Sequence, residues 1–221
     1  MERTELIALS NPGSLVVEAY RNVRNVIRAA KAELKIIEIT GAVSDTGKSV
    51  FTANFAVVMA QAGKRILLVD CDYANPTQHM LFQLNNRGLY ETVASGNDVH
   101  AFCQATAQAG LDLLAAGSGA LSDLFSSERF PQLLDGLKES YDYILLDAPA
   151  VPVGADASAL AVCSDGVLLV VESGKEEPKA LQLAKKRLDQ AKAKVVGCVL
   201  NNMKVDRRYD EFCRMRGDAA C

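Results

Sequence analysis

The tripeptide Gly47-Lys48-Ser49, early in the chain, combines residues that could bind and activate a phosphate chain. A loop whose backbone N–H groups converge at the start of a helix binds phosphate, and a lysine adds a positive charge. A serine hydroxyl in the next position suits a magnesium ion that bridges the outer phosphates of a nucleotide. We therefore predict a site for ATP with Mg2+. For a motif this short, the alternative is a turn that simply opens a helix.

The residues before this tripeptide depart from the usual phosphate-loop pattern. That pattern requires a glycine, four residues and then Gly-Lys-Ser/Thr. Here Ala42 takes the first glycine position and Gly41 lies one residue earlier. Lys48 is assigned to the β- and γ-phosphates, and Ser49 to direct coordination of magnesium. The expected nucleotide contacts run through Ala42, Val43, Ser44, Asp45, Thr46, Gly47, Lys48, Ser49 and Val50.

Acidic residues end two other apolar runs of the chain. Asp70 and Asp72 close the run that starts at Arg65, and Asp147 lies near the end of the run 141–150. Ligands bind outside the carboxyl ends of parallel strands, so these carboxylates are expected to lie beside Lys48. We predict that Asp147 holds a magnesium-bound water. Asp70 and Asp72 would serve the metal and act on the acceptor, and either could be the base that takes the proton of an acceptor tyrosine.

Apolar segments alternate with helical patterns along the whole chain. Strands are expected over 36–39, 65–72, 111–115, 141–150, 166–171 and 195–200, and helices over 15–31, 50–62, 121–125, 130–139, from 156, and over 178–191. This alternation predicts an α/β fold with a mostly parallel central sheet and helices on both faces. Together with the phosphate-binding tripeptide, this fold is typical of the P-loop NTPase class. The segment 77–110 contains no motif to which a role can be assigned.

The composition fits one domain that spans 1–221, with a short polar N-terminal segment (1–13) and a C-terminal tail (about 203–221). The chain has 221 residues, of which 49% are hydrophobic, and a net charge of −3, so it has no broad basic surface for nucleic acid. No apolar run approaches the roughly 20 residues that span a bilayer, and there is no secretory signal pattern. Six cysteines lack metal-ligand or disulfide-framework spacing, which favours the cytoplasm.

The predicted helix 15–31 carries charged residues on one flank. Ser14 is suited to cap it, and Glu18 lies beside a narrow arc of Arg21, Arg24 and Arg28. A solvated face with ion pairs is the simpler interpretation. The alternative is a self-association surface on which Glu18 of one subunit meets arginines of the next.

From about Ser14 to Asn201 the chain resembles the bacterial tyrosine kinases of polysaccharide export, relatives of the Mrp/MinD group of phosphate-loop ATPases. Four ordered motifs carry the resemblance. Ala42-Val-Ser-Asp-Thr-Gly47-Lys48-Ser49 is similar to the Walker A motif of that family, and Ile66-Leu-Leu-Val-Asp70-Cys-Asp72 to its A′ motif. Ile144-Leu-Leu-Asp147-Ala-Pro149 resembles its Walker B motif, and Glu18-Ala-Tyr-Arg21-Asn-Val-Arg24 its Glu-x-x-Arg-x-x-Arg helix.

The resemblance implies a cytoplasmic kinase that a membrane-spanning chain-length regulator recruits to the inner face of the cell membrane and activates. It implies a ring-like homo-oligomer formed through Glu18, Arg21 and Arg24, in place of the simpler interpretation of that helix. Members phosphorylate one another on C-terminal tyrosines, which would make Tyr209 the phosphoacceptor here. Asn201 would lie near the adenine, as in related ATPases.

Three positions depart from the family. Ala74 stands where the A′ motif usually has an arginine, and Val50 where a hydroxyl residue is common. The tail offers one tyrosine, Tyr209, rather than a cluster, so Tyr209 is either the acceptor or an ordinary tail residue.

The favoured function is an ATP- and magnesium-dependent protein-tyrosine autokinase that regulates exopolysaccharide or capsule synthesis. The alternative is a nucleotide-gated regulatory subunit with little or no kinase activity. A DNA-partition ATPase fits less well, because the chain is acidic and Val43 stands where such proteins have a second lysine.

Overall fold

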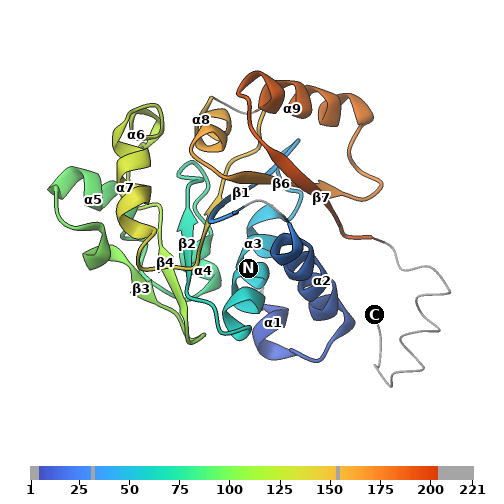
Figure 1. The fold of residues 1–221 in the computed structure, drawn as a ribbon, viewed down its shortest axis with the longest axis horizontal. Coiled ribbons are helices and arrows are strands. Elements are labelled where there is room, and N and C mark those ends of the chain that lie inside the picture. The colour runs from blue at the N-terminus through green and yellow to red at the C-terminus, as the bar shows by residue number, and fades with distance from the viewer. Residues whose placement is uncertain (1–4, 31–32, 153–154, 204–221) are drawn as a thin grey trace.

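The computed structural model describes residues 5–30, 33–152 and 155–203, and Figure 1 shows the fold. The strands of these residues form one seven-stranded sheet in the order β3-β4-β2-β5-β1-β6-β7. They are β1 Ile36–Gly41, β2 Ile66–Asp70, β3 Gln104–Ala105, β4 Leu111–Leu114, β5 Tyr143–Asp147, β6 Gly166–Glu172 and β7 Val195–Asn201. Only β3 runs antiparallel to its neighbour, β4. The predicted mostly parallel sheet is confirmed.

Helices cover both faces of this sheet (Figure 1). They are α1 Ile7–Ser10, α2 Leu15–Ala29, α3 Lys48–Gln61, α4 Gln78–Leu81, α5 Leu89–Ser95, the short 3-10 helix Val99–Phe102, α6 Ser122–Phe125, α7 Arg129–Leu137, α8 Asp156–Val162 and α9 Pro178–Gln190. On one face, α1, α2 and α3 bury apolar side chains against Ile37 and Ile39 of β1. On the other, α6, α7 and α8 pack against Ile36 and the alternate residues of β2 and β5. The central strands are therefore buried on both sides, as their continuous apolar runs require.

The N-terminal segment, expected to be simply polar, contains a helical turn that packs against α3. Leu6 and Ala8 are buried. The Ala8 backbone N–H donates to Asn54 Oδ1 at 2.9 Å, and Gln61 Nε2 donates to the Ala8 carbonyl at 2.9 Å. The side chains of α3 thus satisfy the backbone of a turn that has no periodic pattern of its own.

The strand order brings distant parts of the chain together at one edge of the sheet. In the parallel register, Ile39 of β1 lies opposite Asp147 of β5, and Asp70 of β2 also lies opposite Asp147. The loop that leaves β1 and the carboxylates that end β2 and β5 therefore meet at the carboxyl edge. In the described parts of the chain, no helix is both long enough and apolar enough to cross a bilayer.

Candidate nucleotide-binding site

The loop after β1 has the conformation of a phosphate-binding loop. Asp45 and Gly47 have φ angles of 59° and 76°, and Gly47 caps α3, which begins at Lys48. A Cβ atom on Gly47 would lie 2.5 Å from the Asn201 side-chain amide nitrogen and would have to adopt the positive φ angle, so this position favours glycine. The free N–H groups of the first turn of α3 and its positive dipole end are suited to an anion.

Lys48 runs close to the backbone of the strand that precedes the loop. It is only 7% exposed, and a Cβ on Gly41 would lie 3.0 Å from its Cδ atom. The Thr46 hydroxyl is buried without a hydrogen-bond partner in the described structure. Because a buried ammonium group and a buried hydroxyl both need partners, these groups fit a bound phosphate. The expected roles of Lys48 and the loop residues are compatible with this geometry.

Asp147 ends β5 and is fully buried. Its Oδ1 accepts a hydrogen bond from Thr52 Oγ1 at 3.3 Å, and its Oδ2 accepts one from Gln78 Nε2 at 2.6 Å. Burial raises the pKa of the Asp147 carboxyl, while the hydrogen bond from Gln78, the Lys48 charge and the Ser49 hydroxyl act in the opposite direction. The carboxylate is therefore held by polar neighbours next to the serine that opens the helix.

Asp70 organises the backbone of the loop that follows β2. Its Oδ2 accepts from the N–H groups of Thr77 at 3.1 Å and Gln78 at 3.0 Å, and its Oδ1 accepts from the Asp72 N–H at 3.2 Å. Burial and then the Asp147 carboxylate raise the pKa of Asp70, and these backbone hydrogen bonds oppose them. The carboxylate is fully buried, so an incoming protein substrate cannot reach it.

Asp72 is the accessible member of the pair. It is half-buried, and its Oδ1 accepts only the Asn75 N–H, at 3.3 Å, among the described residues. Burial raises the pKa of Asp72, and the positive charge of Lys48 lowers it. The next residue but one, Ala74, is exposed. Asp72 is thus the carboxylate with both access to solvent and electrostatic contact with Lys48.

The described residues contain no group of three or more Asp, Glu, His or Cys side chains placed to hold a metal ion. Asp70, Asp72 and Asp147 therefore do not form a carboxylate cage. A magnesium ion in a nucleotide site typically takes one or two protein ligands and completes its shell with phosphates and water. Ser49 could supply a direct ligand, and Asp147 could accept a hydrogen bond from a metal-bound water.

Among the described residues, Asn201 and the charged residues of α2 are the other predicted members of the site and the assembly surface. Asn201, at the end of β7, donates from Nδ2 to the Thr46 carbonyl at 2.8 Å, so it contacts the phosphate loop itself. On α2, Arg21 pairs with Glu18 of the same chain and donates to the Pro12 carbonyl at 2.8 Å. Tyr209 lies outside the described residues.

The helix arginine Arg24 contacts the neighbouring helix rather than the ion pair beside it. Its Nη1 donates to the Val58 carbonyl of α3 at 3.3 Å, and its Nε is buried without a partner in the described structure. The charged residues predicted for self-association are thus partly engaged within one chain.

Two polar residues of the site have no counterpart in the predicted set. Thr52 is fully buried and donates to the Lys48 carbonyl at 2.8 Å as well as to Asp147. Gln78 is also fully buried and bridges Asp147 to the Ser49 carbonyl. A polar residue one helical turn after Lys48 is a signal that could have indicated Thr52. Nothing in the pattern around Gln78 distinguishes it.

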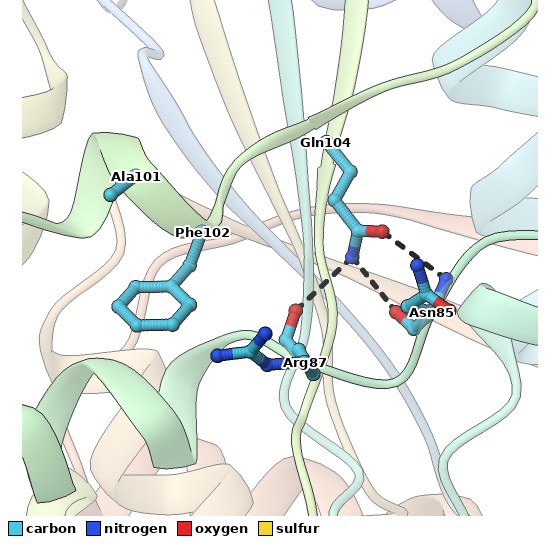
Figure 2. Close-up of a pocket in the computed structure, with 5 residues that line it drawn as sticks. All are labelled: Asn85, Arg87, Ala101, Phe102 and Gln104. Carbon is cyan, nitrogen blue, oxygen red and sulfur yellow. Dashed lines mark hydrogen bonds between the residues drawn. The ribbon is translucent and has the colours of Figure 1, made fainter.

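A separate pocket of about 170 Å3 lies beside β3, away from these residues (Figure 2). Gln104 Nε2 donates to the backbone carbonyls of Asn85, at 2.8 Å, and Arg87, at 3.1 Å. The Arg87 guanidinium lies 5.8 Å from the centre of the Phe102 ring. The polar atoms of Gln104 are thus bonded to backbone, and none of the lining residues belongs to the phosphate loop or the strand-end aspartates.

A phosphate loop at the carboxyl edge of a parallel sheet, with an aspartate at the end of the adjacent strand, is the arrangement of a phosphate-loop ATPase. A family model described as an AAA domain matches residues 34–195. The tyrosine-protein kinase YwqD of Bacillus subtilis (strain 168) is 35% identical over 210 residues, which cover 93% of this chain and 89% of that protein.

Solved structures show the same relationship. The chimerical protein CapA2B2 has a TM-score of 0.85 and 33% identity over 90% of both chains. The kinase domain of the Escherichia coli tyrosine kinase ETK has a TM-score of 0.83 and 28% identity, over 93% of this chain and 84% of that one. This chain belongs to the bacterial tyrosine-protein kinase family, and the predicted family is confirmed.

Proposed function

We propose that this chain is an ATP- and Mg2+-dependent protein-tyrosine kinase that phosphorylates its own tail on Tyr209. One observation carries the proposal: the phosphate loop, Lys48, the half-buried Asp72 and the fully buried Asp147 converge at one sheet edge in a chain whose relatives are tyrosine-protein kinases. The fold of a phosphate-loop ATPase implies that the site binds a nucleotide.

In this proposal, each residue of the site has its own role in phosphoryl transfer. The N–H groups of the loop and the Lys48 ammonium hold the β- and γ-phosphates in line with the acceptor. Ser49 would hold Mg2+ directly and Asp147 would hold it through a metal-bound water, and the ion would neutralise charge on the outer phosphates. The acceptor tyrosine oxygen forms a bond to the γ-phosphorus as the bond to the ADP oxygen breaks, and the phenol proton passes to Asp72. Asp72 is favoured over Asp70 as this base because all three hydrogen bonds of Asp70 go to backbone N–H groups and it is fully buried.

The wider role follows the family resemblance. We propose that the chain regulates exopolysaccharide or capsule synthesis as a ring-like homo-oligomer assembled through Glu18, Arg21 and Arg24. In this proposal it is cytoplasmic, and a membrane-spanning chain-length regulator recruits it to the inner face of the membrane. It forms one domain over 1–221, with the short N-terminal segment and the C-terminal tail as its ends.

A second candidate is a regulatory subunit that binds ATP without kinase output. The exposed Ala74 favours it, because this position lacks a charged group that could contact a phosphate or an acceptor. Both candidates use the same nucleotide site and differ only in phosphotyrosine formation.

Incubation of the purified full chain with labelled ATP and Mg2+ tests the proposal, with the Lys48→Met and Tyr209→Phe variants alongside. We expect phosphotyrosine on the wild type, none on Lys48→Met, and loss of the tail phosphopeptide in Tyr209→Phe by mass spectrometry. Nucleotide binding without phosphotyrosine, even with the cytoplasmic segment of a membrane partner added, would favour the regulatory subunit instead.

A further inference from the structure

Gln78 connects the three parts of the nucleotide site. Its side-chain Nε2 donates to Asp147 Oδ2 at 2.6 Å and to the Ser49 carbonyl at 3.0 Å. Its backbone N–H donates to Asp70 Oδ2 at 3.0 Å. The first residue of α4 is thus bonded to the end of β2, the end of β5 and the first turn of α3.

The orientation of the Gln78 carboxamide follows from its partners. A carboxylate and a carbonyl oxygen both accept hydrogen bonds, so the atom that faces Asp147 and Ser49 must be the NH2 group. The Oε1 atom, on the same carbon, is buried without a hydrogen-bond partner in the described structure. An amide oxygen buried in this way is costly unless a donor reaches it.

The nucleotide site can supply such a donor. Magnesium in nucleotide sites keeps several of its waters, and each water presents hydrogens to nearby acceptors. Groups that contact the ligands of a metal, rather than the metal itself, orient those ligands and change metal affinity. The Gln78 carboxamide lies where Ser49 and Asp147 come together, and one of its two polar atoms already holds Asp147.

We propose, on the basis of the proposed function, that Gln78 is a positioning residue of the magnesium site. Nε2 fixes the Asp147 carboxylate against the first turn of α3, and Oε1 accepts a hydrogen bond from a metal-bound water. Gln78 therefore increases the gain in nucleotide affinity that Mg2+ provides. Since the same residue is anchored to Asp70, it also joins the metal site to the loop that carries Asp72.

The experiment measures binding of a fluorescent ADP analogue to the full chain, in excess EDTA and in Mg2+. The quantity of interest is the ratio of the two dissociation constants. Gln78→Met keeps the length of the side chain and removes both polar atoms. Met80→Leu, at an exposed position of the same helix, is the matched control.

We expect the ratio to fall about tenfold in Gln78→Met, with affinity in EDTA unchanged, and to stay at the wild-type value in Met80→Leu. A wild-type ratio in Gln78→Met would overturn the inference. Equal loss of affinity in EDTA and in Mg2+ would also overturn it, because that result describes a structural role. A wild type that binds ADP more tightly with Mg2+ but forms no phosphotyrosine would refute only the kinase activity.

Discussion

The side-chain amide of Asn201 donates a hydrogen bond to the Thr46 carbonyl across 2.8 Å. The end of β7 therefore contacts the backbone of the phosphate loop, which emerges from β1. Because this amide lies 2.5 Å from the place that a Cβ of Gly47 would occupy, the two residues constrain each other. The expected location of Asn201 near the adenine stays a prediction; its contact with the loop is a second role.

Gly47→Ala should weaken nucleotide binding more than it weakens folding. The new Cβ meets Asn201 and must also adopt a φ of 76°, which costs about 1–2 kcal/mol for a residue other than glycine. Gly63→Ala is the matched control, because Gly63 has a φ of 78° and nothing within 4 Å of its Cβ position. Both variants should lose similar thermal stability, and only Gly47→Ala should lose ADP affinity. Equal ADP affinity in the two variants would contradict this account of the loop.

Lys48→Met should abolish nucleotide-dependent phosphorylation while the fold survives. The methionine keeps most of the apolar stem that packs against Gly41 and removes the charge that faces the phosphates. Autophosphorylation and circular dichroism measured on the same preparation would check this. Undiminished phosphotyrosine in the variant would remove Lys48 from the site.

Asp72→Asn should impair turnover, and Asp70→Asn should impair stability. Loss of a general base typically lowers turnover by about 100-fold or more, so Asp72→Asn should lose kcat while ADP affinity is retained. Asp70→Asn cannot accept all three backbone hydrogen bonds as a carboxylate does, and it should lower the melting temperature instead. Steady-state kinetics and thermal unfolding of both variants separate these outcomes; the reverse pattern would make Asp70 the base.

Glu38 should make the protein less stable as pH rises. It lies in the middle of β1, is 0% exposed, and neither carboxylate oxygen has a partner in the described structure. Burial raises the pKa of Glu38 well above its ordinary value of 4.5. The stability that the neutral Glu38 carboxyl allows is therefore fully present below the unfolded-state pKa. It is lost as pH rises toward the folded-state pKa. Between the two values the free energy of unfolding should fall by up to about 1.4 kcal/mol per pH unit.

The Glu38→Leu variant checks this dependence. It should be more stable than the wild type at pH 8, and the difference should shrink toward pH 4. Denaturant unfolding across this range provides the measurement, and Glu38→Gln should flatten the pH dependence in the same way without the apolar gain. Parallel curves for wild type and Glu38→Leu would show that Glu38 does not titrate between these pH values.

Arg21→Ala should lower the molar mass of the assembled protein in light scattering after size exclusion. A partly exposed surface pair such as Glu18–Arg21 contributes little to the stability of a single chain, so the thermal unfolding of the variant should change little. Arg28→Ala removes an exposed arginine from the same helix outside the motif and should leave the mass unchanged. Equal masses for both variants would exclude Arg21 from the assembly surface.

The strands β1, β2, β5 and β6 were predictable because each is buried on both faces and reads as a continuous hydrophobic run. The strand β3 was not, since Gln104–Ala105 has no pattern and forms a strand only by pairing with β4. The order of the strands could not be predicted from the sequence either, because it depends on packing between distant segments. The predicted family and the tyrosine-kinase class are confirmed by the relatives.

Within the site, the residues that a phosphate loop itself requires were predictable. The residues that other segments of the chain contribute were not. Gly47 and Lys48 follow from what a phosphate loop requires, wherever it occurs. Gln78 lies in a segment with no motif, and its position depends on how Asp70 folds the loop back toward Asp147. The roles assigned to Asp70, Asp72 and Asp147 as metal or base groups stay predictions, although the structure now distinguishes their surroundings.

The pairing of Ile39 with Asp147 has a consequence for how the protein is made. The phosphate loop leaves the ribosome long before the strand that carries Asp147, and the central strand β1 has neither of its neighbours until that later stretch has been synthesised. Such distant pairings form slowly, and a nascent chain that ends before β5 would have the loop but no second half of the pocket. Nucleotide should therefore bind only to nearly complete chains, which would leave the unfinished enzyme inactive throughout translation.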